Sequence, residues 1–298
     1  MKSILRYLAY TVGILSTFIL GGIVFLVVSV QLFSPSILHY GIGVYHEFVA
    51  HNLPSAIEEY TTAIRIEPSF TTYYEFRANA KRRMQKNEEA LLDAQKAVSL
   101  DPSNTKALFL KGFILGSLKK LQQSVDAFTV WVTVDPTDLY AYQYRGFAYG
   151  MLGAESHPRY YDLAAKDFTH VIQLDPRNGT AYFFRALVFG TKISLASKPI
   201  INSSHPDVVA FFKDMNLALK LLGNNPSNKR GCTEGYYVMS VLKAKLGDTK
   251  GADLAFSQAM TLNDFYAMRL KNDPRHKTMK GYYERRWKDI AKEWLSTD

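Results

Sequence analysis

Cysteine is nearly absent from this chain of 298 residues, which contains only Cys232. One cysteine cannot form an internal disulfide. It also excludes the zinc ribbons and redox pairs that use two or more thiols. We therefore expect Cys232 to be a small, partly buried side chain without a chemical role.

Recognisable catalytic motifs are missing as well. The sequence has no Gly-x-Ser-x-Gly motif for a nucleophile and no glycine-rich loop for phosphate. His46, Glu47 and His51 approach the zinc motif His-Glu-x-x-His, but these histidines are five residues apart. Five helical residues separate two side chains by about 140°, so the histidines cannot hold one ion as an i, i+4 pair does. We expect no metal, no cofactor and no enzymatic activity.

Charge is missing between Arg6 and Glu47. Within this stretch, residues 7–33 form an apolar run that, at about 1.5 Å per helical residue, can cross a hydrocarbon core of about 30 Å. A cleavable signal peptide has a shorter apolar core of about 7 to 15 residues. Residues 1–33 are therefore predicted to be a signal anchor that stays in the protein as a transmembrane helix.

The basic residues around this run predict its orientation. Lys2 and Arg6 precede it, whereas the next Lys or Arg is Arg65. Basic residues close to a membrane span stay on the cytoplasmic side. We expect a single-pass membrane protein with a cytoplasmic N-terminus and with the rest of the chain outside the cytoplasm, in the periplasm if the source is bacterial.

The net charge of +9 results from 36 basic and 27 acidic residues. Both signs are mixed along the chain, and this moderate excess suits acidic protein surfaces or anionic lipid headgroups better than nucleic acid. We expect the partners to be other proteins, bound to the membrane or close to it. Residues 7–33 are expected to contact the membrane itself. We expect no nucleic acid.

Proline follows Asp or Glu at a fixed interval. Pro68, Pro102 and Pro136 are each 34 residues apart, and a fourth Asp-Pro pair ends at Pro176. A 34-residue period is typical of a repeated helical hairpin. Small residues recur at positions 8 and 20, an aromatic residue or Leu at position 4, an aromatic residue or Ala at position 24, and usually Ala at position 27. The second, third and fourth repeats carry this set as Tyr74, Ala78, Ala90, Ala94, Ala97; Leu108, Gly112, Ser124, Phe128, Trp131; and Tyr142, Gly146, Ala164, Phe168, Val171.

This pattern resembles the tetratricopeptide repeat family. The resemblance implies an all-α fold, a right-handed superhelical solenoid of about six helix-turn-helix repeats, preceded here by one transmembrane helix. Small residues let the two helices of a hairpin approach, and stacked neighbours bury a face that one hairpin cannot bury alone. We expect the anchor at 1–33, the solenoid at 34–265 and a C-terminal capping helix region at 266–298. The repeats are expected at about 37–70, 71–104, 105–138, 139–178, 179–228 and 233–265.

Position 7 is basic in four successive repeats, and position 23 is Asp in three of them. We interpret these residues as structural ion pairs between the two helices of a repeat, with ligand binding as the alternative. The third repeat departs from the pattern, because its Asp126 comes one position early. The expected pairs are Arg77 with Asp93, Arg145 with Asp167, and Arg185 with Asp214.

Two segments are longer than the repeat requires. Residues 154–160 and 191–207 enlarge the turn in the fourth and fifth repeats, and we expect both to be surface loops on one edge of the solenoid. They are either a docking edge or tolerated variation. A last helix at about 277–295 alternates apolar and basic residues. It is expected to cap the solenoid, and contact with a membrane interface is the alternative.

The first helices of three repeats are aromatic or apolar where the family lines its concave surface. This row is a candidate groove for a partner peptide or helix, although some of its members must pack between helices. Some cytosolic relatives hold a peptide carboxylate with basic and amide side chains at such positions. Here Leu110, Tyr140 and Tyr144 occupy them, so we do not expect that recognition. The groove residues are Phe109, Leu110, Phe113, Tyr140, Tyr144, Phe147, Phe183, Phe184 and Leu187.

These features predict a membrane-tethered scaffold or adaptor for protein–protein interaction, which assembles or positions a membrane or envelope complex. Three alternatives remain open. The chain could be a structural subunit permanently embedded in a larger membrane protein complex, or an adaptor for envelope hydrolases or proteases. It could also be an enzyme accessory whose loops form a site with another chain.

Overall fold

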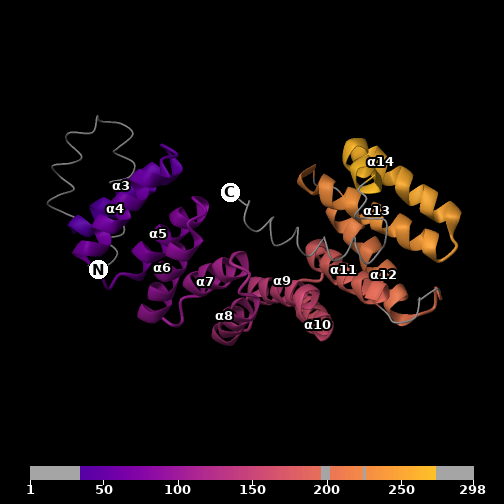
Figure 1. Ribbon diagram of the computed structural model, residues 1–298, viewed down its shortest axis with the longest axis horizontal. Helices are drawn as coiled ribbons and strands as arrows, with labels where there is room; N and C mark the ends of the chain where they lie inside the picture. Colours follow the sequence, from indigo (N-terminus) through magenta and orange to yellow (C-terminus); the bar gives the residue numbers. More distant parts are fainter. Residues whose placement is uncertain (1–33, 196–201, 224–225, 273–298) are drawn as a thin grey trace. The chain divides into compact units, whose positions relative to one another are not determined.

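The computed structural model describes residues 34–195, 202–223 and 226–272, which are helical apart from short turns (Figure 1). This part of the chain contains twelve α-helices, a short 3-10 helix η1 (Pro226–Asn228) and no strand. The α-helices are α3 (Pro35–Phe48), α4 (Leu53–Ile66), α5 (Thr71–Arg83), α6 (Asn87–Leu100), α7 (Thr105–Ser117), α8 (Leu121–Val134), α9 (Leu139–Glu155), α10 (Arg159–Leu174), α11 (Gly179–Leu195), α12 (Pro206–Leu222), α13 (Lys229–Lys245) and α14 (Thr249–Asn272).

The helices follow one another in pairs, and each of the six sequence repeats holds one pair. The last pair runs past the expected end of the array at residue 265, because α14 continues to Asn272. At Asn263 the backbone has φ −158° and ψ 90°, so α14 consists of two helical pieces. The predicted membrane span at 7–33 and the predicted helix at 277–295 lie outside the described residues. Within the described ranges, no helix has the length and hydropathy needed to cross a membrane.

The chain divides into two compact units, residues 1–110 and 111–298, with the boundary inside α7. In the first unit, Ala56, Tyr60 and Ala80 form a buried cluster where α3, α4 and α5 meet. Tyr74 of α5 and Ala97 of α6 belong to a second buried cluster. Small residues beside large rings thus build this core, as the repeat pattern requires.

The second unit repeats this arrangement with phenylalanine rings. Phe128, Phe168 and Phe211 belong to the second helices α8, α10 and α12, and all three are fully buried. Gly112 lies against the first of these rings so closely that an added Cβ would be 2.5 Å from Cε1 of Phe128. A glycine or alanine in the first helix therefore sets how near the second helix can approach.

The insertion at 154–160 is mostly helical, which corrects the expected loop. Residues 154–155 complete α9 and 159–160 begin α10, so only 156–158 form a turn. Gly153 lets the end of α9 lie against the buried ring of Tyr161 on α10. The added residues thus lengthen both helices instead of forming a surface loop.

The insertion at 191–207 is helical at both ends, which corrects part of the expected loop, while residues 202–205 form a turn. Residues 191–195 prolong α11, 206–207 begin α12, and 196–201 lie outside the described residues. Lys192 joins the two enlarged turns, since its Nζ is 2.9 Å from Asp162 Oδ1 and 3.5 Å from Asp207 Oδ1. Turn-forming residues therefore misled the sequence prediction. Leu187 and Thr191 are both buried and four residues apart, so the helical pattern continues into the expected loop.

Candidate protein-binding surface

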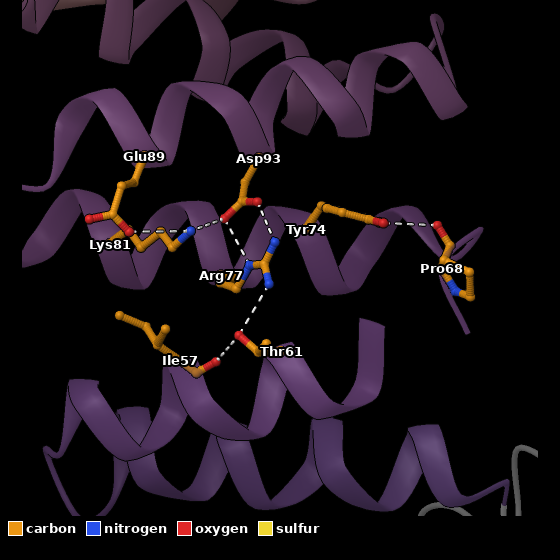
Figure 2. A network of polar contacts seen from close by, with 8 residues as sticks. All are labelled: Ile57, Thr61, Pro68, Tyr74, Arg77, Lys81, Glu89 and Asp93. Carbon is orange, nitrogen blue, oxygen red and sulfur yellow. Dashed lines mark hydrogen bonds and ion pairs between the residues drawn. The ribbon is translucent and has the colours of Figure 1, made fainter. Parts of the chain in front are cut away.

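Arginine side chains at position 7 connect the helices. In the first unit, Arg77 Nε and Nη2 donate to Asp93 Oδ2 and Oδ1 at 2.9 and 2.6 Å (Figure 2). Lys81 Nζ lies 2.9 Å from the same carboxylate. Arg77 Nη1 also donates to Thr61 Oγ1 at 3.1 Å. The guanidinium of α5 therefore holds both α6 of its own hairpin and α4 of the preceding one, with the planar two-pronged geometry that arginine provides.

The second unit contains the same pairing twice. Arg145 Nε and Nη2 donate to Asp167 at 2.9 and 2.7 Å, and Arg185 Nε and Nη2 donate to Asp214 at 2.7 and 2.8 Å. Burial raises the pKa of the Asp167 carboxyl, and Arg145 opposes this rise. Removal of the Arg145 guanidinium would leave the Asp167 carboxylate buried without a partner, and an unpaired buried charge is strongly destabilising.

The threonine partners were missed by sequence reasoning. Arg185 Nη1 donates to Thr169 Oγ1 at 2.9 Å, which repeats the contact of Arg77 with Thr61. A signal was available, since Thr61 and Thr169 each stand seven residues before an Asp/Glu-Pro proline. In the third repeat, Asp126 is exposed and accepts a hydrogen bond from Gln122 Nε2 at 3.0 Å.

The predicted groove residues divide into two groups by burial. Five have little or no exposed surface and pack among the helices: Leu110 in the first unit, and Phe113, Phe147, Phe183 and Leu187 in the second. Phe109, Tyr144 and Phe184 are half-buried, and Tyr140 is 57% exposed. A partner can therefore reach the second group, whereas the first forms its support.

Buried rings hold the accessible ones in place within the second unit. The ring of Tyr144 on α9 stacks at 5.8 Å from that of Phe128 and 6.2 Å from that of Trp131, both on α8. Phe184 on α11 meets Phe147 on α9 edge to face at 4.5 Å. Such ring pairs have preferred geometries and add to the burial energy. Tyr144 and Phe184 thus present a surface that is already ordered before anything binds.

Tyr140 is the most exposed residue of the predicted groove. It lies in the first turn of α9, where its backbone N–H donates to the Asp138 side chain at 2.9 Å. This cap satisfies one of the N–H groups that a helix start leaves free. Tyr144 follows one helical turn later on the same face. Tyr144 and Phe184 both contact the ring of Phe147. Tyr140, Tyr144 and Phe184 therefore define the candidate protein-binding surface.

Polar side chains at first-helix positions of the first unit are engaged in internal contacts. Glu75 is buried and accepts a hydrogen bond from Asn104 Nδ2 at 2.6 Å. Asn79 Nδ2 donates to Glu47 Oε1 at 3.1 Å. Glu47 belongs to the near-zinc motif, yet its carboxylate accepts further hydrogen bonds from Tyr60 and Arg83. In the described part of the chain, no cluster of three or more His, Cys, Asp or Glu could hold a metal ion.

Comparisons with known proteins agree with this architecture. No family model matches the chain. The small glutamine-rich tetratricopeptide repeat-containing protein 2 of Mycosarcoma maydis is 34% identical over 89 residues, which are 30% of this chain and 25% of that protein. The chain thus matches only a quarter of the length of this curated relative.

Solved structures show the class of fold. PilW, described as a widely conserved type IV pilus biogenesis factor, aligns with a TM-score of 0.59 at 15% identity, over 79% of this chain and 96% of PilW. YrrB, described as a TPR protein with an unusual peptide-binding site, aligns with a TM-score of 0.52 at 16% identity, over 71% of this chain and 97% of YrrB. The chain therefore has the tetratricopeptide repeat fold that its sequence predicted.

Proposed function

We propose that this chain is a membrane-tethered scaffold that binds a peptide or helix of a partner protein and positions it in a membrane complex. The candidate surface of Tyr140, Tyr144 and Phe184 supports this proposal most directly. Tyr140 is exposed, and the half-buried rings of Tyr144 and Phe184 rest on the buried rings of Phe128 on α8 and Phe147 on α9. Binding at an ordered aromatic surface loses little conformational entropy, which is why aromatic residues often dominate interfaces.

The fold adds support. Repeat arrays commonly use extended surfaces to bind other chains. YrrB is described as having an unusual peptide-binding site, and PilW as a type IV pilus biogenesis factor. Neither protein is similar enough in sequence to transfer its partner. A peptide or helix as ligand, and the assembly of a membrane complex as the role, are the parts of the proposal that this likeness favours.

Tethering rests on the sequence of residues 7–33. This apolar run is long enough to span a bilayer, and Lys2 and Arg6 on its N-terminal side favour a cytoplasmic N-terminus. The helical repeats are then outside the cytoplasm. They begin immediately after the span, since α3 starts at Pro35. Partners are consequently membrane proteins or chains that emerge from the membrane.

Photo-crosslinking in native membranes tests the binding surface. A photoreactive amino acid replaces Tyr140 in one variant and Leu254 in a matched control, because Leu254 is also well exposed and lies on α14 of the same unit. We expect one reproducible adduct of fixed stoichiometry from position 140 and none from 254. Equal adducts at both positions, or none at 140, would refute the proposed surface.

Cysteine labelling tests the tether and its orientation. Cys232 is buried, with 2% of its surface exposed, so the wild-type chain provides a low background. Ser257→Cys on the exposed side of α14 should react with an impermeant maleimide added outside intact cells, and Ser3→Cys should react only after lysis. The reverse result would place the repeats in the cytoplasm.

A further inference from the structure

Helix α3 has apolar residues on its outer side as well as on the side where Tyr40 and Val44 pack against the core. Its buried residues are Ser36, Gly43 and Glu47. Its outer side is apolar, with Tyr45 56% exposed and Phe48 53% exposed. Val49, the C-cap residue, is 56% exposed. A surface helix normally has charged or polar residues on its outer side.

Two contacts fix α3 in this orientation. Glu47 is fully buried, and its Oε2 accepts a hydrogen bond from Tyr60 Oη at 2.8 Å. Its Oε1 accepts hydrogen bonds from Asn79 Nδ2 at 3.1 Å and Arg83 Nη1 at 3.2 Å. One turn earlier, Gly43 lies against the ring of Tyr60, where an added Cβ would be 2.5 Å from Cε1. Rotation of α3 about its axis would leave a buried carboxylate without these donors, so the apolar side cannot turn inward.

The apolar side of α3 is continuous. Leu38, Ile42 and Tyr45 recur at spacings of four and three residues, and Phe48 and Val49 extend the same stripe to the end of the helix. Leu38 and Ile42 are partly exposed. The stripe contains no charged residue, whereas the exposed Leu92 of α6 stands alone among Glu88, Glu89 and Lys96. Contiguous apolar surface of this kind marks a contact with a partner or a membrane.

The position of α3 in the chain indicates which of these it contacts. Ser34 is the only residue between the apolar run at 7–33 and the start of α3 at Pro35. Two extended residues reach at most about 7 Å, so a span at 7–33 holds the beginning of α3 at the membrane surface. The apolar run and the outer side of α3 thus form one uncharged stretch that Glu47 ends.

We propose that the outer face of α3, formed by Leu38, Ile42, Tyr45, Phe48 and Val49, lies in the interfacial layer of the lipid bilayer. This inference rests on the proposed membrane span. An interfacial helix buries its apolar side at the boundary between headgroups and acyl chains, and a tyrosine there keeps its hydroxyl in the polar layer. The hydrogen bonds of Glu47 connect α3 to α4 and α5. Contact of α3 with the membrane therefore fixes the orientation of the first hairpins toward the bilayer.

Fluorescence quenching on the full chain in phosphatidylcholine nanodiscs tests this contact. Phe48→Cys and, as matched control in the same unit, Leu92→Cys are labelled with an environment-sensitive fluorophore. Leu92 is 67% exposed, so both labels start from accessible positions, and buried Cys232 adds little signal. We expect the label at 48 to show blue-shifted emission, strong quenching by doxyl lipids and weak quenching by iodide. The label at 92 should show the reverse.

Other outcomes overturn the inference in different ways. Equal iodide quenching at both positions would mean that the face of α3 is open to water. Protection at 48 from both quenchers would mean that a protein covers it, either a partner or a second copy of this chain. Extraction of the chain by alkaline carbonate would refute the membrane span itself. A chain that resists extraction while position 48 is open to iodide would refute only the contact of α3.

Discussion

Arg77 of the second hairpin donates a hydrogen bond to Thr61 of the first, with 3.1 Å between Nη1 and Oγ1. The same guanidinium is held by Asp93 on the other side (Figure 2). One charged side chain therefore closes its own hairpin and also fastens it to the preceding one. Arg185 and Thr169 repeat this contact in the second unit, so the connection occurs once in each unit.

Removal of this threonine hydroxyl should weaken the contact between the first two hairpins. We expect Thr61→Val to lower the local stability of α4 and α5 by about 0.5–1.5 kcal/mol, the usual contribution of a hydrogen bond, because Arg77 loses an acceptor. Thr62→Val is the control, since Thr62 bonds only to its own helix, through Glu58 O at 3.1 Å. Hydrogen exchange of the α4 and α5 amides is the measurement. Equal effects of the two substitutions would show that the connection contributes nothing.

Two glycines of α3 should respond in opposite ways to the same substitution. Gly43→Ala places a methyl group against the Tyr60 ring, and we expect it to destabilise the first hairpin by about 1–3 kcal/mol, as overpacking does. Gly41 has nothing within 4 Å of an added Cβ, so Gly41→Ala should stabilise the helix by about 0.5–1 kcal/mol. Thermal unfolding of the two full-length variants compares them. A destabilised Gly41→Ala variant would contradict the packing of α3 described here.

The hydroxyl of Tyr60 should make the first hairpins sensitive to alkali. Burial, together with Glu47, raises the pKa of Tyr60 far above its ordinary value of 10.0. The unfolded chain therefore releases this proton near pH 10, whereas the folded chain keeps it, and stability falls as the pH rises above that value. Tyr60→Phe should flatten the dependence of stability on pH between about pH 9 and 11. It should also lower stability at neutral pH, because Glu47 loses a donor. An unchanged slope would mean that the hydroxyl titrates normally.

The sequence predicted the fold well because its information was local and periodic. The prolines at 34-residue intervals defined the hairpins, and the offset between Arg145 and Asp167 followed the longer fourth repeat. The environment of Glu47 could not be predicted in the same way, since Asn79 and Arg83 follow it by 32 and 36 residues and belong to another hairpin.

The candidate surface was predicted only in part. Position in the repeat identified which helix carries the aromatic residues. Position in the repeat did not distinguish the exposed Tyr140 from Phe147, which is covered by a neighbouring ring. That difference depends on packing between adjacent repeats, and the side chains there vary from one repeat to the next. The insertions were misread because their turn-forming residues hid the continuing helices, in which Tyr161 and Ile193 are buried.

Phe147 and Tyr140 should separate folding from binding, although both belong to α9 and to the predicted groove. Phe147 is 5% exposed, and we expect Phe147→Ala to destabilise the second unit by about 3–5 kcal/mol, the usual effect of removing a buried ring. Tyr140 is largely exposed, so Tyr140→Ala should change stability by less than about 0.5 kcal/mol. If Tyr140 is a main contact, its loss should weaken partner binding by about 2 kcal/mol or more.

Circular dichroism melting and affinity for the partner identified by crosslinking are measured on the same preparations of full-length chain. Leu254→Ala serves as the control for a change at an exposed apolar residue away from the surface. The expected pattern is a stable Tyr140→Ala variant with weakened binding, beside a Leu254→Ala variant that behaves as wild type. If the Tyr140→Ala and Phe184→Ala variants remain folded and bind with full affinity, the aromatic surface is not the binding site. The helical extensions around residues 154–160 would then be the next region to test, because they are the part of the second unit that the repeat itself does not require.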